Sequence, residues 1–531
     1  MARVSAEGRT SEHEASWERA RSRIGFFAGP LLFLLVLLLP TPEAFLREAE
    51  AQAAASPAGL EIASLAFGMK VTLALLLLMV TWWVTEAVPL PVTALLPGIF
   101  LPLFQVIGVQ EGQPVELNSR AVLAHYAHPV IFLFLSGFLI AGAMQKWGLD
   151  RRIALWILTR GNIAASPGKV LLSLMGASAF ISMWVSNTAT TAMMLPIGLG
   201  ILSRVSDTRA SPNYARALLL GIAYAASIGG VGTIIGTPPN GIAVSILRQQ
   251  NVARLDFLEW MTFGLPFVLL AVPLAWVVLR VTFPFDVTFD AGVRALLREE
   301  RAALGPLGRG EKLTLVGFLL AVVLWTTNPF WSFLPGLGRR LAWFDEHLVA
   351  LSVAILLFLL PVDWKRRQFV LRWEDSRYVD WGTLLLFGGG LALSDAMFKT
   401  GLARVLASAF VALFGKPNPL LLVFMVVIFM ELLTEVTSNT AVTAMMVPIL
   451  ISMASGLGAD AASLVLPATI AASMAFMLPV ATPPNALVYA TRRVTIADML
   501  RAGVFLDLVA WLYIVAFFYG YVASVLGLVR F

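Results

Sequence analysis

A polar segment of twelve residues occurs twice in this chain, each time inside a long apolar stretch. Residues 185–196 read VSNTATTAMMLP and residues 437–448 read TSNTAVTAMMVP, and nine of the twelve positions are identical. Hydroxyl and amide side chains are costly in an apolar environment unless they find hydrogen-bond partners. One isolated copy could be explained by side chains that bond their own helix. Two copies point to a shared function.

Other segments recur in the same order around these two copies. The segment SGFLIAGAMQKWGL at 136–149 resembles GGGLALSDAMFKTGL at 388–402, and GTPPN at 236–240 resembles ATPPN at 481–485. In chain order the offsets are 253, 252 and 245 residues. We therefore expect two halves with the same order of parts, each with about five full membrane crossings and one hairpin. An odd number of crossings inverts the second half relative to the first, as in many secondary transporters.

The composition excludes several classes of protein. The chain is 59% hydrophobic and only 13% charged, whereas a soluble domain is about half apolar and a quarter charged. The net charge of +6 is typical of the basic cytoplasmic loops of membrane proteins and does not require a nucleic-acid partner. The chain has no cysteine, and no HExxH motif or suitably placed GxSxG motif occurs. We expect an integral protein of the lipid bilayer that is not an enzyme and holds no organic cofactor.

The apolar stretches predict an all-α polytopic fold. A spanning helix needs about 20 apolar residues. On this basis we expect about eleven transmembrane helices, near residues 24–40, 66–87, 90–107, 128–145, 214–236, 258–281, 312–331, 346–361, 381–396, 462–480 and 502–527. Two further regions, about 165–202 and 418–453, are too long for one span and have polar centres. We interpret each as a re-entrant hairpin, because irregular backbone at membrane depth must line a cavity or be buried in protein.

Loop charges predict the orientation in the cytoplasmic membrane. Basic residues gather at 291–313, 364–377 and 491–501, which should therefore be cytoplasmic, and the loop 41–62 is acidic and should be external. The N-terminus would then be cytoplasmic and the C-terminus external. The expected divisions are the cytoplasmic N-terminus, first transmembrane helix and external loop (1–65), the first inverted repeat (66–285), a cytoplasmic linker (286–311) and the second inverted repeat (312–531).

The repeated SNT triplets, at the expected hairpin tips, carry the chemistry of the repeat. They are Ser186, Asn187 and Thr188 in the first half and Ser438, Asn439 and Thr440 in the second. Hydroxyl and carbonyl oxygens suit a hard cation such as sodium. Hydroxyl, amide and backbone N–H groups at a helix N-terminus suit an anion. Both ligands remain open on these residues alone.

The paired TPPN segments predict helix breaks. Two successive prolines remove two N–H donors and clash with the preceding turn. At 237–240 and 482–485 they should interrupt a membrane helix, free carbonyls for a cation and open a new helix N-terminus to an anion. Three acids also lie in apolar context, namely Glu86, Glu431 and Glu435. An acid within the membrane suggests a functional site. Three roles stay open for Glu435: to stabilise the second hairpin, to affect an ion site, or to couple transport to protons.

With these motifs, the chain resembles the divalent anion/sodium symporter family of dicarboxylate, tricarboxylate and sulfate carriers. The resemblance extends from about residue 66 over nearly all of the chain and rests on the paired SNT and TPPN motifs and on WWVTEAVPLPVTALLP at 82–97. It implies a homodimer in which each chain has a scaffold domain and a moving transport domain. The transport domain would contain both hairpins and both broken helices and would move as an elevator.

The resemblance also implies two sodium sites and a substrate site between the two tips. The positions that match the first sodium site are Ser182, Ser186, Asn187 and Gly236. Those that match the second are Thr434, Ser438, Asn439 and, through its carbonyl, Ala481. Substrate carboxylates would be held by Ser186, Asn187, Thr188, Ser438, Asn439 and Thr440, with Thr237, Pro238, Thr482 and Pro483 nearby.

The leading functional hypothesis is a sodium-coupled symporter of C4-dicarboxylates such as succinate, malate and fumarate. No Lys or Arg lies within the SNT or TPPN motifs, so bound sodium ions and helix N-termini would have to balance a dianion. Two alternatives within the same family remain. One is a sodium-independent exchanger of dicarboxylates or of citrate against succinate, and the other is a sulfate carrier.

Overall fold

The structure is a computed structural model. It describes residues 2–56, 60–160, 166–205, 211–287, 292–333, 343–415 and 417–530. The chain divides into two compact units, and each is treated by itself. Unit 1 comprises 1–128, 381–418 and 440–465, and unit 2 comprises 129–380, 419–439 and 466–531. Both units draw on both halves of the predicted repeat, whose boundaries remain a prediction.

Unit 1 contains the N-terminal helices and parts of the second half. Its elements are α1 (Ala2–Leu38), α2 (Glu43–Ala54), α3 (Ile62–Thr85), α4 (Leu90–Thr93), α5 (Leu96–Leu103), β1 (Ile107–Gln110), β2 (Gln113–Glu116), α6 (Ser119–Leu123), η1 (Ala124–Ala127), α18 (Trp381–Thr400), α19 (Leu402–Phe414) and, from Thr440 on, α21 (Asn439–Leu457).

Helix α18 lies at the centre of unit 1, where it packs against α3, α4, α5 and η1. Its glycines allow this close packing. A Cβ on Gly389 would lie 2.2 Å from the carbonyl oxygen of Ala94, and one on Gly388 would lie 2.3 Å from the ring of Tyr126. Neither gap admits a methyl group, so the GGG sequence serves helix packing.

Unit 2 contains both helices around the first SNT triplet, the helix before the second SNT triplet, and both TPPN segments. Its elements are α7 (Pro129–Trp147), α8 (Leu149–Leu158), α9 (Pro167–Ser182), α10 (Asn187–Leu202), α11 (Ser211–Gly230), α12 (Pro238–Gln249), α13 (Phe257–Thr282), α14 (Gly292–Ala303), α15 (Arg309–Thr327), η3 (Asn328–Phe333), α17 (Glu346–Leu359), β3 (Pro361–Asp363), β4 (Gln368–Phe369), η4 (Trp373–Tyr378), α20 (Pro419–Thr434), α23 (Pro483–Tyr489), α24 (Ile496–Phe517) and η5 (Phe518–Ala523). Helix α22 (Ala461–Ala471) begins in unit 1 and ends in unit 2.

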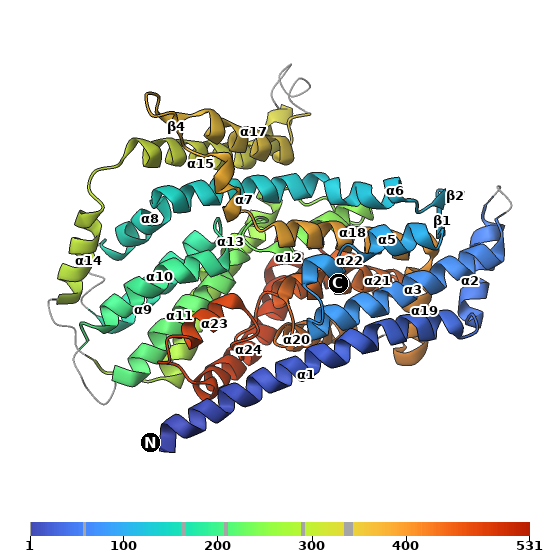
Figure 1. Cartoon of the computed structure of the whole chain (residues 1–531), viewed down its shortest axis with the longest axis horizontal. Coiled ribbons are helices and arrows are strands. Elements are labelled where there is room, and N and C mark those ends of the chain that lie inside the picture. Colours follow the sequence, from blue (N-terminus) through green and yellow to red (C-terminus); the bar gives the residue numbers. More distant parts are fainter. Residues whose placement is uncertain are drawn as a thin grey trace. The chain divides into compact units, whose positions relative to one another are not determined.

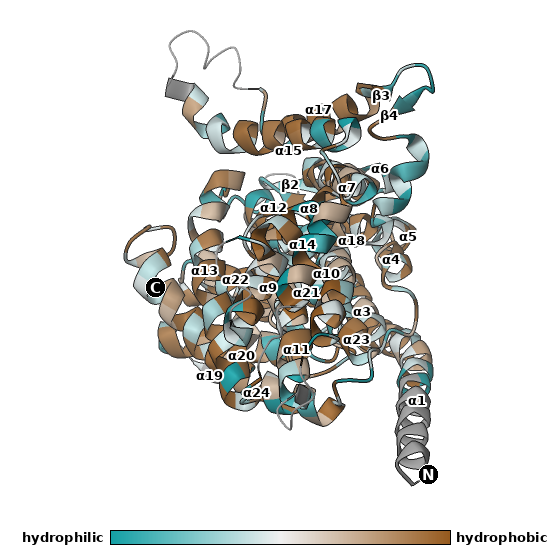
Figure 2. Ribbon diagram, turned by 90° about the vertical axis from the view of Figure 1, so that its left-hand side faces the viewer, coloured by the Kyte–Doolittle hydropathy of each residue, from teal (hydrophilic) through white to brown (hydrophobic). Residues whose placement is uncertain are grey.

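Helix α11 forms the centre of unit 2. It packs against α9, α10, α13 and α23, and α24 packs against α13 and α20 (Figure 1). Helices α15 and α17 are largely apolar, whereas the β3–β4 hairpin that follows them is polar (Figure 2). Three helices that adjoin repeated motifs, α9, α10 and α23, therefore pack against one buried helix.

The all-helical, multi-span architecture predicted from the sequence is confirmed. Eight helical segments of the described chain are long and apolar enough to cross a membrane: Arg19–Leu38, Ile62–Thr85, Ser119–Trp147, Phe257–Thr282, Arg309–Trp331, Trp381–Thr400, Asn439–Leu457 and Ile496–Ala523. The predicted count of about eleven is not reached by this measure. Four expected spans end early or are interrupted, at 90–107, 214–236, 346–361 and 462–480.

Three details differ from the expectation. Residues 43–54, expected in an external loop, form helix α2. Two short antiparallel hairpins, β1–β2 and β3–β4, occur among the helices. Residues 439–457, expected as one arm of a hairpin, form a helix long enough to span a membrane. In each case tertiary packing, which periodicity alone does not reveal, decides which local structure forms.

Candidate binding site

The first SNT triplet lies at a helix break, as predicted. Helix α9 ends at Ser182 and α10 begins at Asn187. Ser186 caps α10, and its hydroxyl accepts a hydrogen bond from the backbone N–H of Ala189 at 3.3 Å. The Ser182 hydroxyl donates to the Asn187 side-chain oxygen across the break at 2.8 Å. Serine at this position satisfies an otherwise unpaired N–H of the new helix.

The first TPPN segment also begins a new helix. Helix α11 ends at Gly230, and α12 begins at Pro238, where a missing N–H costs nothing. Asn240 holds the break together, because its side-chain NH2 donates to the carbonyls of Gly230 at 3.0 Å and Thr233 at 2.7 Å. The freed carbonyls of the broken helix are thus partly satisfied by the asparagine of the motif.

The two breaks of the first half meet at glycines. A Cβ on Gly230 would lie 2.6 Å from the Asn187 side-chain oxygen. A Cβ on Gly236 would lie 2.4 Å from the carbonyl oxygen of Gly230 and 3.1 Å from that of Met183. Only a residue without a side chain fits at these two points. The result is a group of neutral oxygens from side chains and backbone, which is the ligand type that a hard cation prefers.

The second SNT triplet repeats this geometry. Helix α20 ends at Thr434 and α21 begins at Asn439. The Thr434 hydroxyl lies 2.5 Å from the Asn439 side-chain oxygen and 2.9 Å from the carbonyl oxygen of Ala472. A hydroxyl has one hydrogen and can donate to only one of these oxygens at a time. The five-residue spacing from Thr434 to Asn439 is that from Ser182 to Asn187.

The second TPPN segment has the bonding pattern of the first. Helix α22 ends at Ala471 and α23 begins at Pro483. The Asn485 side-chain NH2 donates to the carbonyls of Ala475 at 3.1 Å and Leu478 at 3.0 Å, which lie ten and seven residues before it. Asn240 bonds the carbonyls ten and seven residues before it as well. The two helix breaks are therefore structural copies.

Elements of both copies are brought together in unit 2. Helix α10, which begins within the first SNT triplet, packs against α23, which begins within the second TPPN segment. Helix α11 also packs against α23. The Tyr224 hydroxyl donates to the carbonyl of Phe476 at 2.8 Å and so joins α11 to the second break. The helix of one SNT triplet thus lies beside the helix of the other half's TPPN segment.

The predicted site residues differ in exposure. Half of those expected around sodium are buried: Ser182, Gly236, Thr434 and Ala481. Those at least partly accessible are Ser186, Asn187, Thr188, Pro238, Ser438, Asn439 and Pro483. Thr237, Thr440 and Thr482 are buried. The structure places three pairs of these groups together: Ser182 with Asn187, Gly236 with the Gly230 carbonyl, and Thr434 with Asn439. Direct contacts of Thr188, Ser438 and Thr440 with substrate groups remain predictions.

Two of the three acids noted in the sequence, Glu431 in α20 and Glu435 just after that helix, lie beside the second break. Glu435 accepts hydrogen bonds from the backbone N–H groups of Met477 at 2.8 Å and Leu478 at 3.0 Å. It therefore stabilises the break from the neighbouring helix end. Glu86 lies elsewhere, at the end of α3, where its side chain is 51% exposed and 3.9 Å from Arg21. Because its side chain is half exposed, Glu86 is not a buried acid.

Sequence reasoning missed several residues that contact the two helix breaks. Three of them belong to no repeated motif: Met183 and Ala472, which contribute backbone carbonyls, and Thr233, whose hydroxyl donates to the Met183 carbonyl. Asp507 lies in α24, is 1% exposed and has an apolar sequence around it. The rule that an acid within an apolar helix suggests function would have found Asp507.

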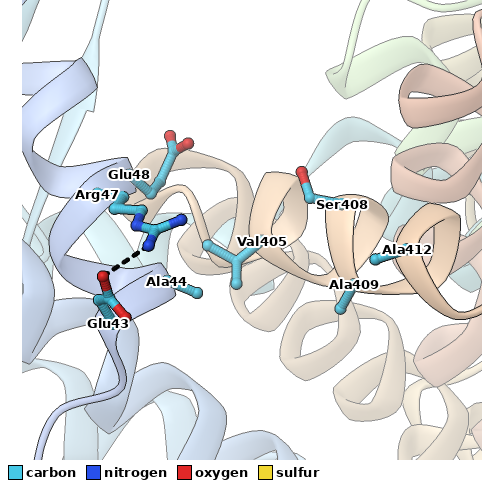
Figure 3. Close-up of a pocket in the computed structure, with 8 residues that line it drawn as sticks. All are labelled: Glu43, Ala44, Arg47, Glu48, Val405, Ser408, Ala409 and Ala412. Atoms are coloured by element: carbon cyan, nitrogen blue, oxygen red, sulfur yellow. Dashed lines mark hydrogen bonds and ion pairs between the residues drawn. The ribbon is translucent and has the colours of Figure 1, made fainter.

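Two other clusters of the described chain lack the features of this site. The cavity between α2 and α19, about 520 Å³, is lined by Glu43, Ala44, Arg47, Glu48, Val405, Ser408, Ala409 and Ala412, and is drawn in Figure 3. Its Glu43 and Arg47 pair with each other across an exposed surface.

Asp345, Glu346 and His347 lie close enough to share a metal ion. Glu346 already pairs with Arg248 at 2.8 Å, which accounts for one of the three side chains.

Comparison with known proteins decides the family. The family model described as the sodium:sulfate symporter transmembrane region matches residues 55–528. The chain belongs to this family. Members of the sodium:sulfate symporter family are transporters, so the chain is a multi-pass integral membrane protein of a transporter family and not an enzyme. The resemblance seen in the sequence is thereby confirmed.

Relatives and solved structures agree with this assignment. The sodium-dependent dicarboxylate transporter SdcS of Staphylococcus saprophyticus is 36% identical over 518 residues, which cover 95% of this chain and 92% of the relative. The protein of the same name from Staphylococcus aureus strain USA300 has the same identity and coverage. The YdaH transporter of Alcanivorax borkumensis superimposes with a TM-score of 0.53 at 15% identity, over 86% of this chain and 100% of that one. MtrF of Neisseria gonorrhoeae superimposes with a TM-score of 0.53 at 11% identity, over 89% and 97%. Both superpositions show that this chain has the same fold as these two solved structures.

Proposed function

We propose that this protein is a sodium-coupled symporter of C4-dicarboxylates such as succinate, malate and fumarate. The observation that carries the proposal is the pair of matching helix breaks, each with a group of uncharged oxygens from a hydroxyl, an amide and backbone carbonyls. Relatives named sodium-dependent dicarboxylate transporter, 36% identical over 95% of the chain, support the choice of ion and substrate.

In this proposal the coupling ions bind at the two breaks. Ser182, Ser186, Asn187 and Gly236 would hold one sodium ion, and Thr434, Ser438, Asn439 and the carbonyl of Ala481 the other. The substrate carboxylates would contact Ser186, Asn187, Thr188, Ser438, Asn439 and Thr440, with Thr237, Pro238, Thr482 and Pro483 nearby. Two sodium ions neutralise a dianion, which explains how a site without Lys or Arg could hold one.

The proposal includes the architecture that the sequence predicted. Residues 66–285 and 312–531 would be inverted repeats, joined by a cytoplasmic linker at 286–311 and preceded by a cytoplasmic N-terminus, a first span and an external loop in 1–65. The C-terminus would be external. Two chains would form a homodimer, and a transport domain with both breaks would move against a scaffold as an elevator. The equal bonding at Asn240 and Asn485 supports the repeat.

Reconstituted vesicles test the coupling. Purified protein in liposomes is given radiolabelled succinate with an inward sodium gradient, or with the same concentration of potassium, while the lumen is empty. We expect uptake that requires sodium and saturates with succinate. Uptake that needs a preloaded dicarboxylate and is indifferent to sodium would show that the exchanger alternative is correct and this proposal is wrong.

A second candidate follows from the description of the family model, which names sodium and sulfate. A tetrahedral dianion is smaller than succinate and could use the same hydroxyl and N–H groups. Competition decides between the two. If the protein is a sulfate carrier, excess unlabelled sulfate abolishes succinate uptake and labelled sulfate accumulates with sodium. If it is a dicarboxylate symporter, sulfate at the same concentration leaves succinate uptake unchanged.

A further inference from the structure

Three side chains of the kinds that ligate metals lie at the start of helix α17 in unit 2. Asp345 caps this helix, and Glu346 and His347 are its first two residues. One oxygen of each carboxylate and a ring nitrogen of His347 all lie within 4.8 Å of one another. The Nδ1 atom of His347 lies 3.3 Å from Oδ2 of Asp345 and 3.8 Å from Oε1 of Glu346. The three side chains therefore face a common point.

The Nδ1 atom of His347 is buried without a hydrogen bond. The side chain is 10% exposed, and no group in the described part of the chain forms a hydrogen bond with this nitrogen. A proton on Nδ1 would be donated to a carboxylate, but neither neighbouring carboxylate is placed to accept it. A buried polar atom without a partner often marks the place of an ion or a water molecule. Because this nitrogen faces two carboxylate oxygens, a cation would satisfy all three atoms.

Other contacts hold the two carboxylates in position. Oδ1 of Asp345 accepts hydrogen bonds from two backbone N–H groups of α17, both at 3.1 Å, which leaves Oδ2 for a ligand. The ring N–H of Trp325 donates to the backbone carbonyl of Glu346 at 3.0 Å. Arg248, near the end of α12, donates to Oε1 of Glu346 at 2.8 Å. Carboxylates that ligate metals are commonly hydrogen-bonded by an outer residue in this way.

The charge around these residues favours a cation. The charges of Glu346 and Arg248 both act on Glu259, in the first turn of α13. Together with Asp345, the group therefore has three carboxylates against one arginine. The side chain of Asp345 is 49% exposed, so an ion can reach the group from solvent.

We propose that Asp345, Glu346 and His347 bind a divalent transition metal ion, with zinc as the best match. A tetrahedral zinc ion with bonds of about 2.0–2.2 Å places its ligand atoms about 3.3–3.6 Å apart. Nδ1 of His347 and Oδ2 of Asp345 already have this separation. An imidazole nitrogen suits zinc, whereas calcium and magnesium prefer oxygen ligands. The site goes beyond the proposed transport function and does not depend on it.

A bound ion would strengthen the junction between α17 and α12. Glu346 is joined to Arg248 in the last turn of α12, the helix that begins at the first TPPN break. The three ligands are arranged by the start of α17, and the unfolded chain does not hold them together. Since the ion binds the folded protein in preference to the unfolded chain, it raises the thermal stability.

Calorimetry measures the site directly. Purified full-length protein in detergent is stripped with EDTA, transferred to a buffer without chelator and titrated with zinc chloride. We expect one saturable ion per chain. His347→Gln should weaken zinc binding by at least the 10–100-fold that is about typical for loss of an outer partner of a metal ligand. Asp345→Asn should do the same, although asparagine keeps the helix cap.

His125→Gln is the matched control. His125 also lies beside a carboxylate, that of Asp395 at 3.1 Å, but this carboxylate already pairs with Lys399 at 2.8 Å. The variant should bind zinc as the wild type does. Zinc should raise the melting temperature of the wild type and of this control, and should leave those of His347→Gln and Asp345→Asn unchanged.

X-ray absorption at the zinc edge needs no variant. In the wild-type complex we expect one imidazole nitrogen and otherwise oxygen ligands, at about 2.0–2.2 Å. A shell with no imidazole, or with two or more, would place the ion elsewhere and overturn the proposal. This measurement decides the matter if either ligand variant fails to fold.

Two further results would overturn the proposal. One is wild-type protein that does not bind zinc. The other is equal binding by the wild type, His347→Gln and Asp345→Asn, which would show an adventitious ion only. None of these measurements uses succinate uptake, so failure of the proposed function and failure of the metal site are distinguished.

Discussion

Asn240 and Asn485 perform the same task in the two halves of the chain. Each lies at the third position of the helix that follows a TPPN break, and each donates to the carbonyls seven and ten residues before it. Both are fully buried. Backbone carbonyls released by a helix break need partners when water is absent. These two amides supply them, which gives the final letter of the TPPN motif a structural reason.

Asn485→Ala should weaken the second break. The substitution removes two buried hydrogen bonds, and we expect a loss of about 1–3 kcal/mol in stability together with loss of transport. Thermal unfolding followed by fluorescence, with uptake in liposomes, measures both. Asn213→Ala is the control, because the Asn213 side-chain NH2 donates to one carbonyl, that of Pro284, at a more exposed position. Equal stability of the two variants would contradict the assigned role.

Gly230→Ala should disable the first break. The new Cβ would lie 2.6 Å from the Asn187 side-chain oxygen and 3.1 Å from Thr237, so Asn187 must move. We expect sodium-driven uptake to fall by about tenfold or more, because displacement of a ligand by a fraction of an ångström weakens the site. Gly176→Ala is the matched control, since a Cβ at Gly176 on α9 meets nothing within 4 Å. Normal uptake by Gly230→Ala would exclude Asn187 from the site.

Ser182→Ala and Thr434→Ala should raise the sodium concentration that gives half-maximal uptake. Each removes a hydroxyl that contacts the asparagine at its break, and a loss of about 1.4 kcal/mol in ion binding means a tenfold weaker affinity. Uptake is measured as a function of sodium at saturating succinate. Thr434→Ser keeps the hydroxyl and should remain near wild type. Sodium curves that coincide for all variants would remove both residues from the proposed sodium sites.

Asp150 gives a prediction about pH. Burial at the start of α8 raises the pKa of its carboxyl from 3.8 to about 6, although the backbone N–H of Arg151 donates to it. Between these two pH values the folded protein binds more protons than the unfolded chain, so stability falls as the pH rises and stays lowered above the folded pKa. Asp150→Asn should be about 3 kcal/mol more stable than wild type at neutral pH and nearly equal to it near pH 4.

Melting curves of both proteins from pH 4 to pH 8 measure this difference. Asp345 offers a control. Its carboxylate caps α17 by accepting hydrogen bonds from the backbone N–H groups of His347 and Leu348, but its side chain is half exposed. Asp345→Asn should not gain stability over the same range. A constant difference between Asp150→Asn and wild type across the range would contradict the effect of burial.

Helix breaks were predictable from the sequence because their chemistry is local. Proline at 238 and 483 excludes a preceding helical turn, and Ser186 offers a side-chain oxygen to the first N–H groups of the next helix. These signals need no knowledge of distant residues. The family could also be predicted, since the same motifs occur twice and carry the resemblance.

What packs against each break could not be predicted in the same way. The sequence from 462 to 480 has no charged residue and was expected to span the membrane, yet α22 ends at Ala471. Glu435 and Asn485 bond the backbone that follows, and neither lies in that stretch. Helix α2 was missed because the acidic sequence at 43–54 is equally typical of a loop. Distant partners decide such cases.

The bonding at the TPPN breaks has a consequence for motion. In the first break Asn240 donates to Gly230 and Thr233, and all three belong to one continuous stretch of eleven residues. Both hydrogen bonds are therefore made within this one stretch of chain and need no partner outside it. Its surroundings can change from protein to water or lipid head groups while these two hydrogen bonds persist, so a change of surroundings incurs no penalty for breaking and remaking them.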